Sequence, residues 1–457
     1  MFATSSSKPH SLRKRMIANV YSKSYIQSSQ ASKSQIAHIL SNRLLPALNG
    51  YSECINREPR SKDYKDVEVF SLFLATAMDL ITAYLFGLSN STNFIDQESY
   101  RQNWQEMYLA RANYPFWTQE VPTLTYFCKK WLPWLRLYPK WVDESNSKLS
   151  DWNWSLCDKI NKTRIENEVF NYKGEVADAD KPVVYDALHA GIDREFKANG
   201  EGSILYSTSV LQRDRAIASE LMDHSLAGQE TAGIALTYAT WHISRSPSIQ
   251  QQLRTEVLAL EPSLRFKSSC GTKVEGFGQG GEKEGTESIS GNPTLPDPKA
   301  VDSLPLLHAV VMETLRLHAP IPGPQPRQTP KEGCCIEGHY IPGDVRIASL
   351  AYTLHRDIEV FPQSEQWKPE RWFAQVSSGD KTTEPSQDEL RLREMHKRFW
   401  AFGSGGRMCI GSNFAMDEIK FILAAIYANF QTTVVDDEGI VQEDAYTARP
   451  VGERLVI

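Results

Sequence analysis

The chain has 457 residues, of which 41% are hydrophobic and 23% are charged, the ordinary balance of a soluble globular protein. Its formal net charge of −6, with no segment dominated by basic residues, gives no reason to expect nucleic acid as a partner. The seven cysteines are odd in number, irregularly spaced and without C-x-x-C pairs, which argues against a disulfide framework and an ordinary zinc site.

The first part of the chain predicts helices. His10 to Ser22 reads as the start of a basic amphipathic helix, and the short polar segment before it does not predict a signal peptide. Residues 24–60 continue in a helical pattern. Residues 69–88 are long and apolar enough to span a membrane, but Asp79 interrupts them. A carboxylate at mid-span costs about 2.5–3.5 kcal/mol, so we expect a buried core helix here, with the membrane span as the alternative.

Residues 104–154 are unusually aromatic. Side chains of this kind, at this density, either fill a core or line an apolar cavity. The segment contains seven tryptophans: Trp104, Trp117, Trp131, Trp134, Trp141, Trp152 and Trp154.

Residues 214–244 predict one long helix, which would span about 45 Å. Ala227-Gly-Gln-Glu-Thr231 lies near its middle. Gly228 costs about 1 kcal/mol relative to alanine in a helix interior, and a buried acid such as Glu230 is also costly. Such departures within one turn indicate a functional site. The alternative is a solvent-facing Glu-Thr pair with an incidental glycine.

The next segments alternate between helical and polar patterns. Residues 247–260 predict a helix, and residues 266–298, rich in Gly, Ser, Glu and Pro, predict a flexible insertion. Residues 306–317 resume helical periodicity. Glu313 and Arg316 lie on one face of this helix, and a surface ion pair worth under about 1 kcal/mol is the default reading.

The carboxyl-terminal part has shorter elements. The proline-rich residues 320–330 must be extended, and residues 338–350 predict short strands. Residues 375–396 are polar and predict a second flexible insertion. Residues 431–457 alternate enough to predict a terminal hairpin.

A glycine-rich loop, residues 402–411, carries Cys409 and precedes an apolar helical pattern that reaches Phe430. Glycines let a backbone lie flat against a planar ligand, and a thiolate at a helix N-terminus is favoured by the helix dipole. A phosphate-binding loop is an alternative, but no Gly-Lys-Ser/Thr follows. An ordinary buried thiol is the other alternative.

This loop resembles the haem-ligand signature of the cytochrome P450 family, Phe-x-x-Gly-x-Arg-x-Cys-x-Gly. All five fixed positions agree, at Phe402, Gly405, Arg407, Cys409 and Gly411. The resemblance implies haem b as cofactor, with Cys409 as the thiolate ligand of the iron. It also implies that Arg407 holds a haem propionate, that Phe402 shields the sulfur, and that the glycines clear the porphyrin.

The long helix carries a second match. Ala227 to Thr231 resembles the oxygen-activation motif of the same family, Ala/Gly-Gly-x-Asp/Glu-Thr. The resemblance implies that Thr231 hydrogen-bonds the dioxygen or a proton-delivering water and that Glu230 links that water to solvent. Gly228 would open the groove in which oxygen lies.

Two further matches concern the surroundings of the haem. Glu313 and Arg316 resemble the family's Glu-x-x-Arg, which Arg371 of Pro369-Glu-Arg-Trp372 would complete as a buried structural network.

Three basic residues resemble propionate contacts. These are His10 and Lys14, the latter in place of the usual arginine, and Arg327. By position, residues 104–154 resemble the roof of the substrate channel together with a membrane-facing surface.

The resemblance implies a mainly α cytochrome P450 fold with a small β-component, in a single domain over residues 1–457. Because the helix near His10 lies far into the chain in other members, the sequence suggests an amino-terminal truncation without the anchor and first helices. The resemblance implies a location at the cytosolic face of the endoplasmic reticulum membrane, and a cytoplasmic or peripheral membrane location is the alternative if the anchor is missing.

The function implied is a haem-thiolate monooxygenase. It would insert one oxygen atom from O2 into an apolar small molecule, such as a secondary-metabolite intermediate, with electrons from NADPH-cytochrome P450 reductase. Two alternatives stay open: an inactive or non-catalytic haem-binding fragment, and an isomerase or dehydratase that needs no O2. The acid–threonine pair argues against the second.

Overall fold

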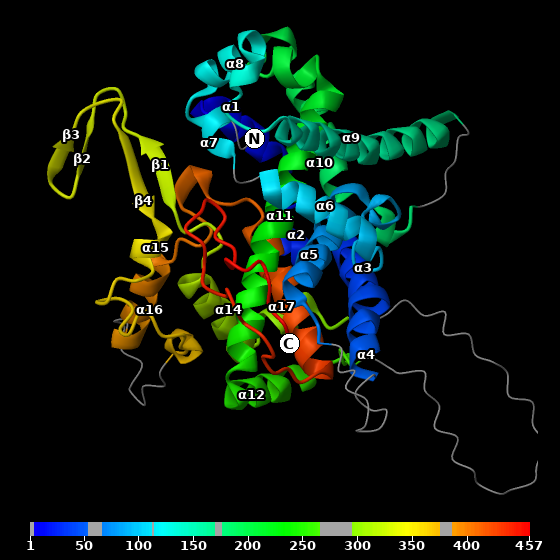
Figure 1. Ribbon diagram of the computed structural model, residues 1–457, viewed down its shortest axis with the longest axis vertical. Helices are drawn as coiled ribbons and strands as arrows, with labels where there is room; N and C mark the ends of the chain where they lie inside the picture. Colours follow the sequence, from blue (N-terminus) through cyan, green and yellow to red (C-terminus); the bar gives the residue numbers. More distant parts are fainter. Residues whose placement is uncertain (1–3, 54–65, 112–113, 170–175, 266–294, 375–385) are drawn as a thin grey trace, which may run out of the picture.

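The computed structural model describes residues 4–53, 66–111, 114–169, 176–265, 295–374 and 386–457. Within these ranges the protein is mainly helical, and two helices form its centre: α5 (Val69–Phe86) and α11 (Arg213–Ser244). Figure 1 shows α11 running through the middle of the molecule with α5 beside it. The largest hydrophobic cluster extends from Ile17 to Leu455, so both ends of the described chain contribute to one core.

The remaining α-helices surround this pair. Their bounds are α1 (Ser7–Ile17), α2 (Lys23–Ser28), α3 (Gln30–Ile39), α4 (Leu45–Glu53), α6 (Glu98–Arg111), α7 (Pro115–Gln119), α8 (Pro122–Trp131), α9 (Lys140–Val169), α10 (Val183–Asn199), α12 (Pro247–Leu258), α13 (Pro298–Asp302), α14 (Pro305–Leu317), α15 (Ala351–Leu354), α16 (Gln387–Arg398) and α17 (Ser412–Asn429). Short π and 3₁₀ turns join several of them, including η1 (Leu40–Leu44), η7 (Pro369–Trp372) and η8 (Gly405–Arg407).

Helix α5 is buried, as its sequence predicts. It is the one helix of the described residues with the length and hydropathy of a membrane span, and 94% of it lies inside the protein. Asp79 is fully buried and forms an ion pair with Arg43 at 3.1 Å. It also accepts hydrogen bonds from the Thr92 hydroxyl at 2.7 Å and the Phe94 amide at 2.8 Å. The carboxylate is therefore satisfied inside the core rather than inserted into lipid.

Two glycines of α11 allow α5 to approach closely. A Cβ at Gly228 would lie 2.7 Å from Cγ1 of Ile81, and one at Gly233 would lie 2.6 Å from Cδ2 of Leu74. Both distances are too short for real contacts, so any side chain larger than hydrogen would push the helices apart. The structure thus supports a packing role for Gly228. Its role in opening a groove for oxygen stays a prediction.

The strands form two small antiparallel pairs. Strand β1 (Pro324–Gln328) pairs with β4 (Arg346–Leu350), with Arg327 opposite Ile347. Strand β2 (Cys334–Ile336) pairs with β3 (His339–Ile341). These pairs confirm the predicted extended and strand segments, and Figure 1 shows them projecting from one side of the helical body.

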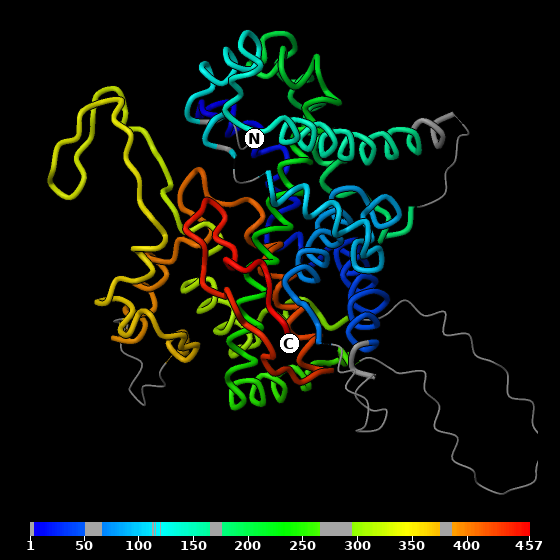
Figure 2. Tube along the Cα trace, viewed as in Figure 1, coloured from blue at the N-terminus to red at the C-terminus, as the bar shows by residue number. Residues whose placement is uncertain are grey.

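The carboxyl-terminal segment after α17 runs back over the central helices, as Figure 2 shows in red. The Tyr238 hydroxyl on α11 donates to the Ile440 carbonyl at 3.0 Å, and the Trp241 indole donates to Asp437 at 2.8 Å. The predicted terminal hairpin is present as an antiparallel chain reversal, with bridges between Asp436 and Val456 and between Gln442 and Pro450. The bridges are isolated, so the described residues form no continuous pair of strands here.

The second predicted insertion is wrong over much of its length. Residues 387–396 belong to α16, although residues 375–385 lie outside the described part of the chain. The Glu389 amide donates to the Ser386 hydroxyl at 3.2 Å, and the Ser386 amide donates back to the Glu389 carboxylate at 3.1 Å. This capping box satisfies amide groups that a helix start otherwise leaves unpaired. Most of the first predicted insertion, residues 266–294, also lies outside the described residues.

Candidate functional site

The glycine-rich loop before α17 presents an open backbone face. Gly403 and Gly405 have φ of +70° and +67°, values that favour glycine. A Cβ built on Gly405 or Gly406 would meet no atom within 4 Å. The Cys409 amide donates to the Phe402 carbonyl at 2.8 Å, which closes the loop and fixes the cysteine. The loop can therefore lie against a flat group without collision.

Cys409 is accessible and chemically suited to bind a metal. The residue is exposed, yet the surrounding protein still removes enough water from the sulfur for desolvation to raise the pKa of the thiol. The amides of Gly411 and Ser412 and the nearby Lys14 ammonium oppose this rise in pKa. The free group is thus a thiol, and a bound metal ion would deprotonate it.

The described residues contain no group of three or more His, Cys, Asp or Glu side chains that could hold a metal ion. Cys409 is accordingly a single protein donor. This donor set suits an iron whose other ligands come from a prosthetic group, because haem supplies four nitrogen ligands of its own.

Two residues of α1 lie beside this loop. The Lys14 ammonium donates to the carbonyl of Met408 at 2.7 Å and to that of Gly406 at 3.3 Å. His10 is buried, and desolvation lowers its pKa, with further lowering by the charges of Arg407 and Lys14. His10 is therefore a neutral ring inside a positively charged neighbourhood.

Two arginines add to that positive charge. Arg407 donates to the carbonyls of Thr4 and Ser5, both at 2.7 Å, and Arg327 on β1 donates to the carbonyl of Ser404 at 2.9 Å. Among the described residues no carboxylate forms an ion pair with Lys14, Arg407 or Arg327. Basic groups that face a loop without an acidic partner suit an anionic ligand such as the two propionates of haem. The residues present thus fit the cofactor.

The other two predicted residues of the loop are Phe402 and Gly411, and their contacts do not test the roles predicted for them. Phe402 is partly buried and packs against the main core. A Cβ at Gly411 would lie 3.9 Å from the Cys409 sulfur, an ordinary contact. Their roles in shielding the sulfur and clearing a porphyrin stay predictions.

The acid and the hydroxyl of the predicted oxygen-activation motif have different partners. The Thr231 hydroxyl donates to the Ala227 carbonyl at 2.8 Å, within α11 itself. Glu230 is buried and accepts a hydrogen bond from the Tyr108 hydroxyl of α6 at 2.6 Å. Its other oxygen lies 3.6 Å from Nε of Arg449 in the carboxyl-terminal segment. The carboxylate therefore faces α6 and that segment.

Sequence reasoning missed Tyr108 and Arg449. A buried carboxylate is expected to accept hydrogen bonds, so burial of Glu230 predicts that it has donor partners. Nothing local identifies them, because the tyrosine lies 122 residues away along the chain.

The predicted structural network on α14 is confirmed. Glu313 and Arg316 are fully buried and joined by two hydrogen bonds of 2.8 and 2.9 Å, and Arg371 adds a third at 2.9 Å. The Trp372 indole and the Lys368 amide also donate to Glu313, each at 2.9 Å. Every position around this carboxylate is filled by a protein donor, so it has no freedom to act as an acid or base.

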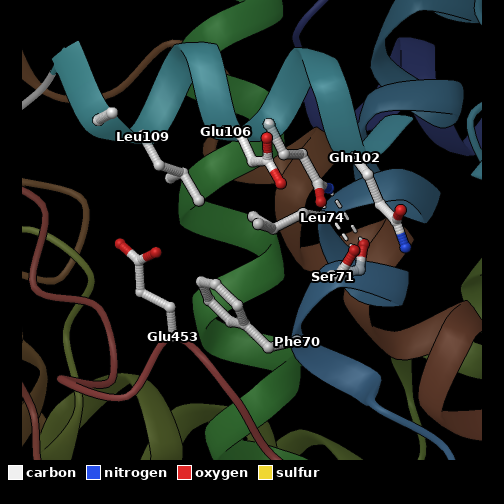
Figure 3. Close-up of a pocket in the computed structure, with 9 residues that line it drawn as sticks. Phe70, Ser71, Leu74, Gln102, Glu106, Leu109 and Glu453 are labelled. Carbon is white, nitrogen blue, oxygen red and sulfur yellow. Dashed lines mark hydrogen bonds between the residues drawn. The ribbon is translucent and has the colours of Figure 1, made fainter. Parts of the chain in front are cut away.

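A pocket of about 450 Å³ lies next to the Glu230 cluster. Figure 3 shows it between α6, α5 and the carboxyl-terminal segment, with α11 behind. Gln102 and Glu106 of α6, Ser71 of α5 and Glu453 of the carboxyl-terminal segment give it a polar lining. Glu453 is also bonded to Arg449, at 2.6 Å.

Comparisons with known proteins agree with this geometry. Residues 282–450 match the sequence model of the cytochrome P450 family. The chain is 32% identical to cytochrome P450 monooxygenase tazI of Aspergillus terreus, over 53% of this chain and 41% of that protein. It is 27% identical to cytochrome P450 monooxygenase azaI of Aspergillus niger, over 50% of this chain and 45% of that protein. The chain thus covers less than half the length of each of these relatives.

The fold is shared with solved structures. The crystal structure of a cytochrome P450 (CYP102L1) superposes with a TM-score of 0.65 at 17% identity, covering 99% of this chain and 82% of the other. The cytochrome P450DA heme domain gives 0.61 at 18% identity, covering 97% and 76%. The chain therefore has the fold of these cytochrome P450 structures, and its residues 282–450 match the sequence model of that family.

Proposed function

We propose that the chain binds haem b through Cys409 and acts as a monooxygenase that inserts one oxygen atom from O2 into an apolar small organic molecule. The observation that carries this proposal is the accessible Cys409 thiol on an open glycine loop, near cationic groups that have no acidic partner among the described residues. Bound haem would supply the iron chemistry that activates O2. The names of the fungal relatives support the same class of reaction.

The residues of the chain have separate roles in this proposal. Cys409 would hold the iron, while Lys14, Arg407 and Arg327 would hold the propionates and His10 would pack beside them. Thr231 would orient the oxygen or a water through its hydroxyl. That hydroxyl donates to Ala227, and its oxygen can still accept a hydrogen bond. Glu230 would exchange protons with solvent.

The substrate side of the proposal rests on the aromatic region. Several large apolar side chains of α8 and the turn after it are exposed: Tyr126 at 60%, Trp131 at 62% and Trp134 at 79%. An exposed group of this kind suits contact with lipid or with an apolar molecule entering the protein. A secondary-metabolite intermediate, an NADPH-dependent reductase as electron donor and a location at the cytosolic face of the endoplasmic reticulum belong to the same proposal.

The test is the spectrum of the haem-loaded chain after reduction and addition of carbon monoxide. We expect the Soret band of a thiolate-ligated iron in the wild-type protein and its loss in Cys409→Ser. Cys335→Ser, which changes another exposed cysteine, is the matched control and should keep the band. An unchanged band in Cys409→Ser would overturn the proposal. A correct band without product, when a reductase and candidate substrates are supplied, would favour a non-catalytic haem protein.

A further inference from the structure

Glu230 is held from two sides by residues that no sequence motif marks. Tyr108 on α6 donates to one carboxylate oxygen at 2.6 Å, and Arg449 in the carboxyl-terminal segment lies 3.6 Å from the other. All three side chains are almost fully buried. Burial also raises the pKa of Tyr108, and Glu230 raises it further, so the phenol stays protonated and remains a donor.

The contact between Glu230 and Arg449 is incomplete. Its 3.6 Å separation exceeds a direct hydrogen bond, and neither the Glu230 oxygen nor Nε of Arg449 has another hydrogen-bond partner among the described residues. The carboxylate oxygen therefore keeps an acceptor position without a hydrogen bond, directly beside the arginine.

Arg449 connects this position to the pocket. Its Nη1 bonds Glu453 at 2.6 Å, and its Nη2 lies 3.9 Å from Glu443. Glu453 lines the 450 Å³ pocket, where Figure 3 shows its carboxylate opposite Glu106 of α6. A cavity of this size with two carboxylates and several amide groups holds water readily. Arg449 thus contacts both Glu230 and one residue of the pocket lining.

We propose that Tyr108 and Arg449 are positioning residues that hold Glu230 where it takes up protons from the pocket. This inference rests on the proposed monooxygenase function. A pocket water gives a proton to the Glu230 carboxylate, the hydroxide left behind is reprotonated from bulk solvent, and the carboxyl passes its proton toward Thr231. No electrons move in this sequence. The other titratable and charged groups near the acid are Tyr446, and Arg111 against the Tyr108 ring.

The test compares two ways of driving product formation. With NADPH and O2 the protein must draw two protons from solvent, whereas hydrogen peroxide brings the oxygen with two electrons and two protons already attached. A whole acid–base group contributes about 10²–10⁴-fold, so losing one positioning contact should reduce product formed per NADPH by about tenfold. We expect this loss in Tyr108→Phe and Arg449→Gln, with peroxide-driven product unchanged and with recovery in Arg449→Lys.

The chain offers a matched control for each variant. Tyr206→Phe removes an exposed phenol–carboxylate hydrogen bond of 3.1 Å to Glu201, outside the aromatic segment, and Arg454→Gln removes an exposed ion pair of 2.8 Å with Asp436. Both should keep the wild-type product yield per NADPH. If the peroxide-driven reaction falls as much as the NADPH-driven one in Tyr108→Phe, or if neither falls, the inference is wrong.

A measurement without turnover separates this inference from the proposed function. The shifts in urea midpoint of Tyr108→Phe, Glu230→Gln and the double variant should not add, because both single changes weaken the same contact. Additive shifts would contradict the positioning role even if the protein makes product. Wild-type protein that forms no product with either oxidant would contradict the proposed function, whereas the urea measurement would still report on Tyr108 and Glu230.

Discussion

Among the buried carboxylates that face an arginine, Glu313 and Glu230 have different surroundings. Glu313 accepts from Arg316, Arg371, the Trp372 indole and the Lys368 amide, and no oxygen is left without a partner. Glu230 accepts one hydrogen bond from Tyr108 and faces Arg449 across 3.6 Å, with one oxygen free of hydrogen bonds in the described structure. Both oxygens of Glu313 thus accept hydrogen bonds from protein groups. One oxygen of Glu230 does not, so it can accept a proton or a further hydrogen bond.

The comparison separates a charge that stabilises the fold from a charge for which we propose a role in proton transfer. A saturated pair in a dry interior is costly to break, because either partner alone would be an uncompensated buried charge. A carboxylate with an unfilled hydrogen-bonding position near a polar pocket contributes less to the free energy of unfolding. It is better able to take up and release a proton. Substitutions in the Glu313 cluster should therefore mainly lower stability, and substitutions at Glu230 should mainly lower product formation.

The largest effect should come from Glu313→Gln. The change leaves Arg316 and Arg371 buried without their counter-charge, and breaking such a pair costs about 3–5 kcal/mol. We expect the free energy of unfolding, measured with urea, to fall by that amount. Glu365→Gln, which alters an exposed partner of Arg356, is the control and should change little. A small effect of Glu313→Gln would remove the basis of the comparison.

The next effect concerns pH and the histidine attached to the saturated cluster. Nδ1 of His355 donates to the Arg316 carbonyl at 2.8 Å, and Nε2 accepts from the Trp400 amide at 2.8 Å, so the buried ring is neutral. Burial lowers its pKa from 6.5 to about 3. Below pH 6.5 the unfolded chain binds a proton that the folded chain does not. Stability should therefore fall as pH drops from 6.5 toward 3, by up to about 1.4 kcal/mol per pH unit.

Urea unfolding at pH 7 and pH 5 measures this slope. Between pH 7 and pH 5 the share of His355 is about 2 kcal/mol. Other buried histidines contribute in the same direction, since His318 and His224 also have lowered pKa values, to about 3 and about 4. His355→Asn should lose its own share of the pH dependence, and an equal slope in this variant would show that His355 is not the group responsible.

A smaller effect on stability is expected for Glu230→Gln. Arg449 keeps its bond to Glu453, and the glutamine carbonyl can still accept from Tyr108. We expect the free energy of unfolding to change by no more than about 1 kcal/mol, the value of one hydrogen bond. The product formed per NADPH should fall strongly in the same variant. A loss of stability as large as that of Glu313→Gln would mean that Glu230, like Glu313, mainly stabilises the fold.

The smallest effect is expected at the exposed pair of Arg454 and Asp436. The Arg454 side chain is 50% exposed, and exposed ion pairs contribute about 0–1 kcal/mol. Arg454→Gln should therefore leave the urea midpoint almost unchanged, and the remaining difference should disappear at high salt. A shift in urea midpoint as large as that of Glu230→Gln would mean that solvent exposure does not determine how much these ion pairs contribute to stability.

The sequence predicts the long helices with a regular apolar pattern, but it does not predict the helix whose residues are mostly polar. The helices at residues 69–88, 214–244 and 306–317 correspond to α5, α11 and α14, because their apolar periodicity is sustained over many turns. The segment of α16 was predicted to be flexible, because its polar composition shows little apolar periodicity. Ser386 followed three residues later by Glu389 was the local signal that could have found it.

The site divides in the same way. The Cys409 loop and the α11 motif are contiguous in sequence, so their residue types and spacing identify them. Tyr108 and Arg449 reach Glu230 only through the packing of α6 and of the carboxyl-terminal segment against α11. Contacts of this kind depend on the tertiary structure, and no local pattern in a single chain encodes them.

The close seating of α11 on α5, through Gly228 and Gly233, has a consequence for how substrate preference can evolve. With both glycines in contact with Ile81 and Leu74, the two helices cannot slide or separate without leaving a void. If the chain binds an apolar molecule as proposed, we expect variation in the size of that molecule to depend on the exposed aromatic side chains of α8 and the turn after it, such as Trp131 and Trp134, and not on this helix contact.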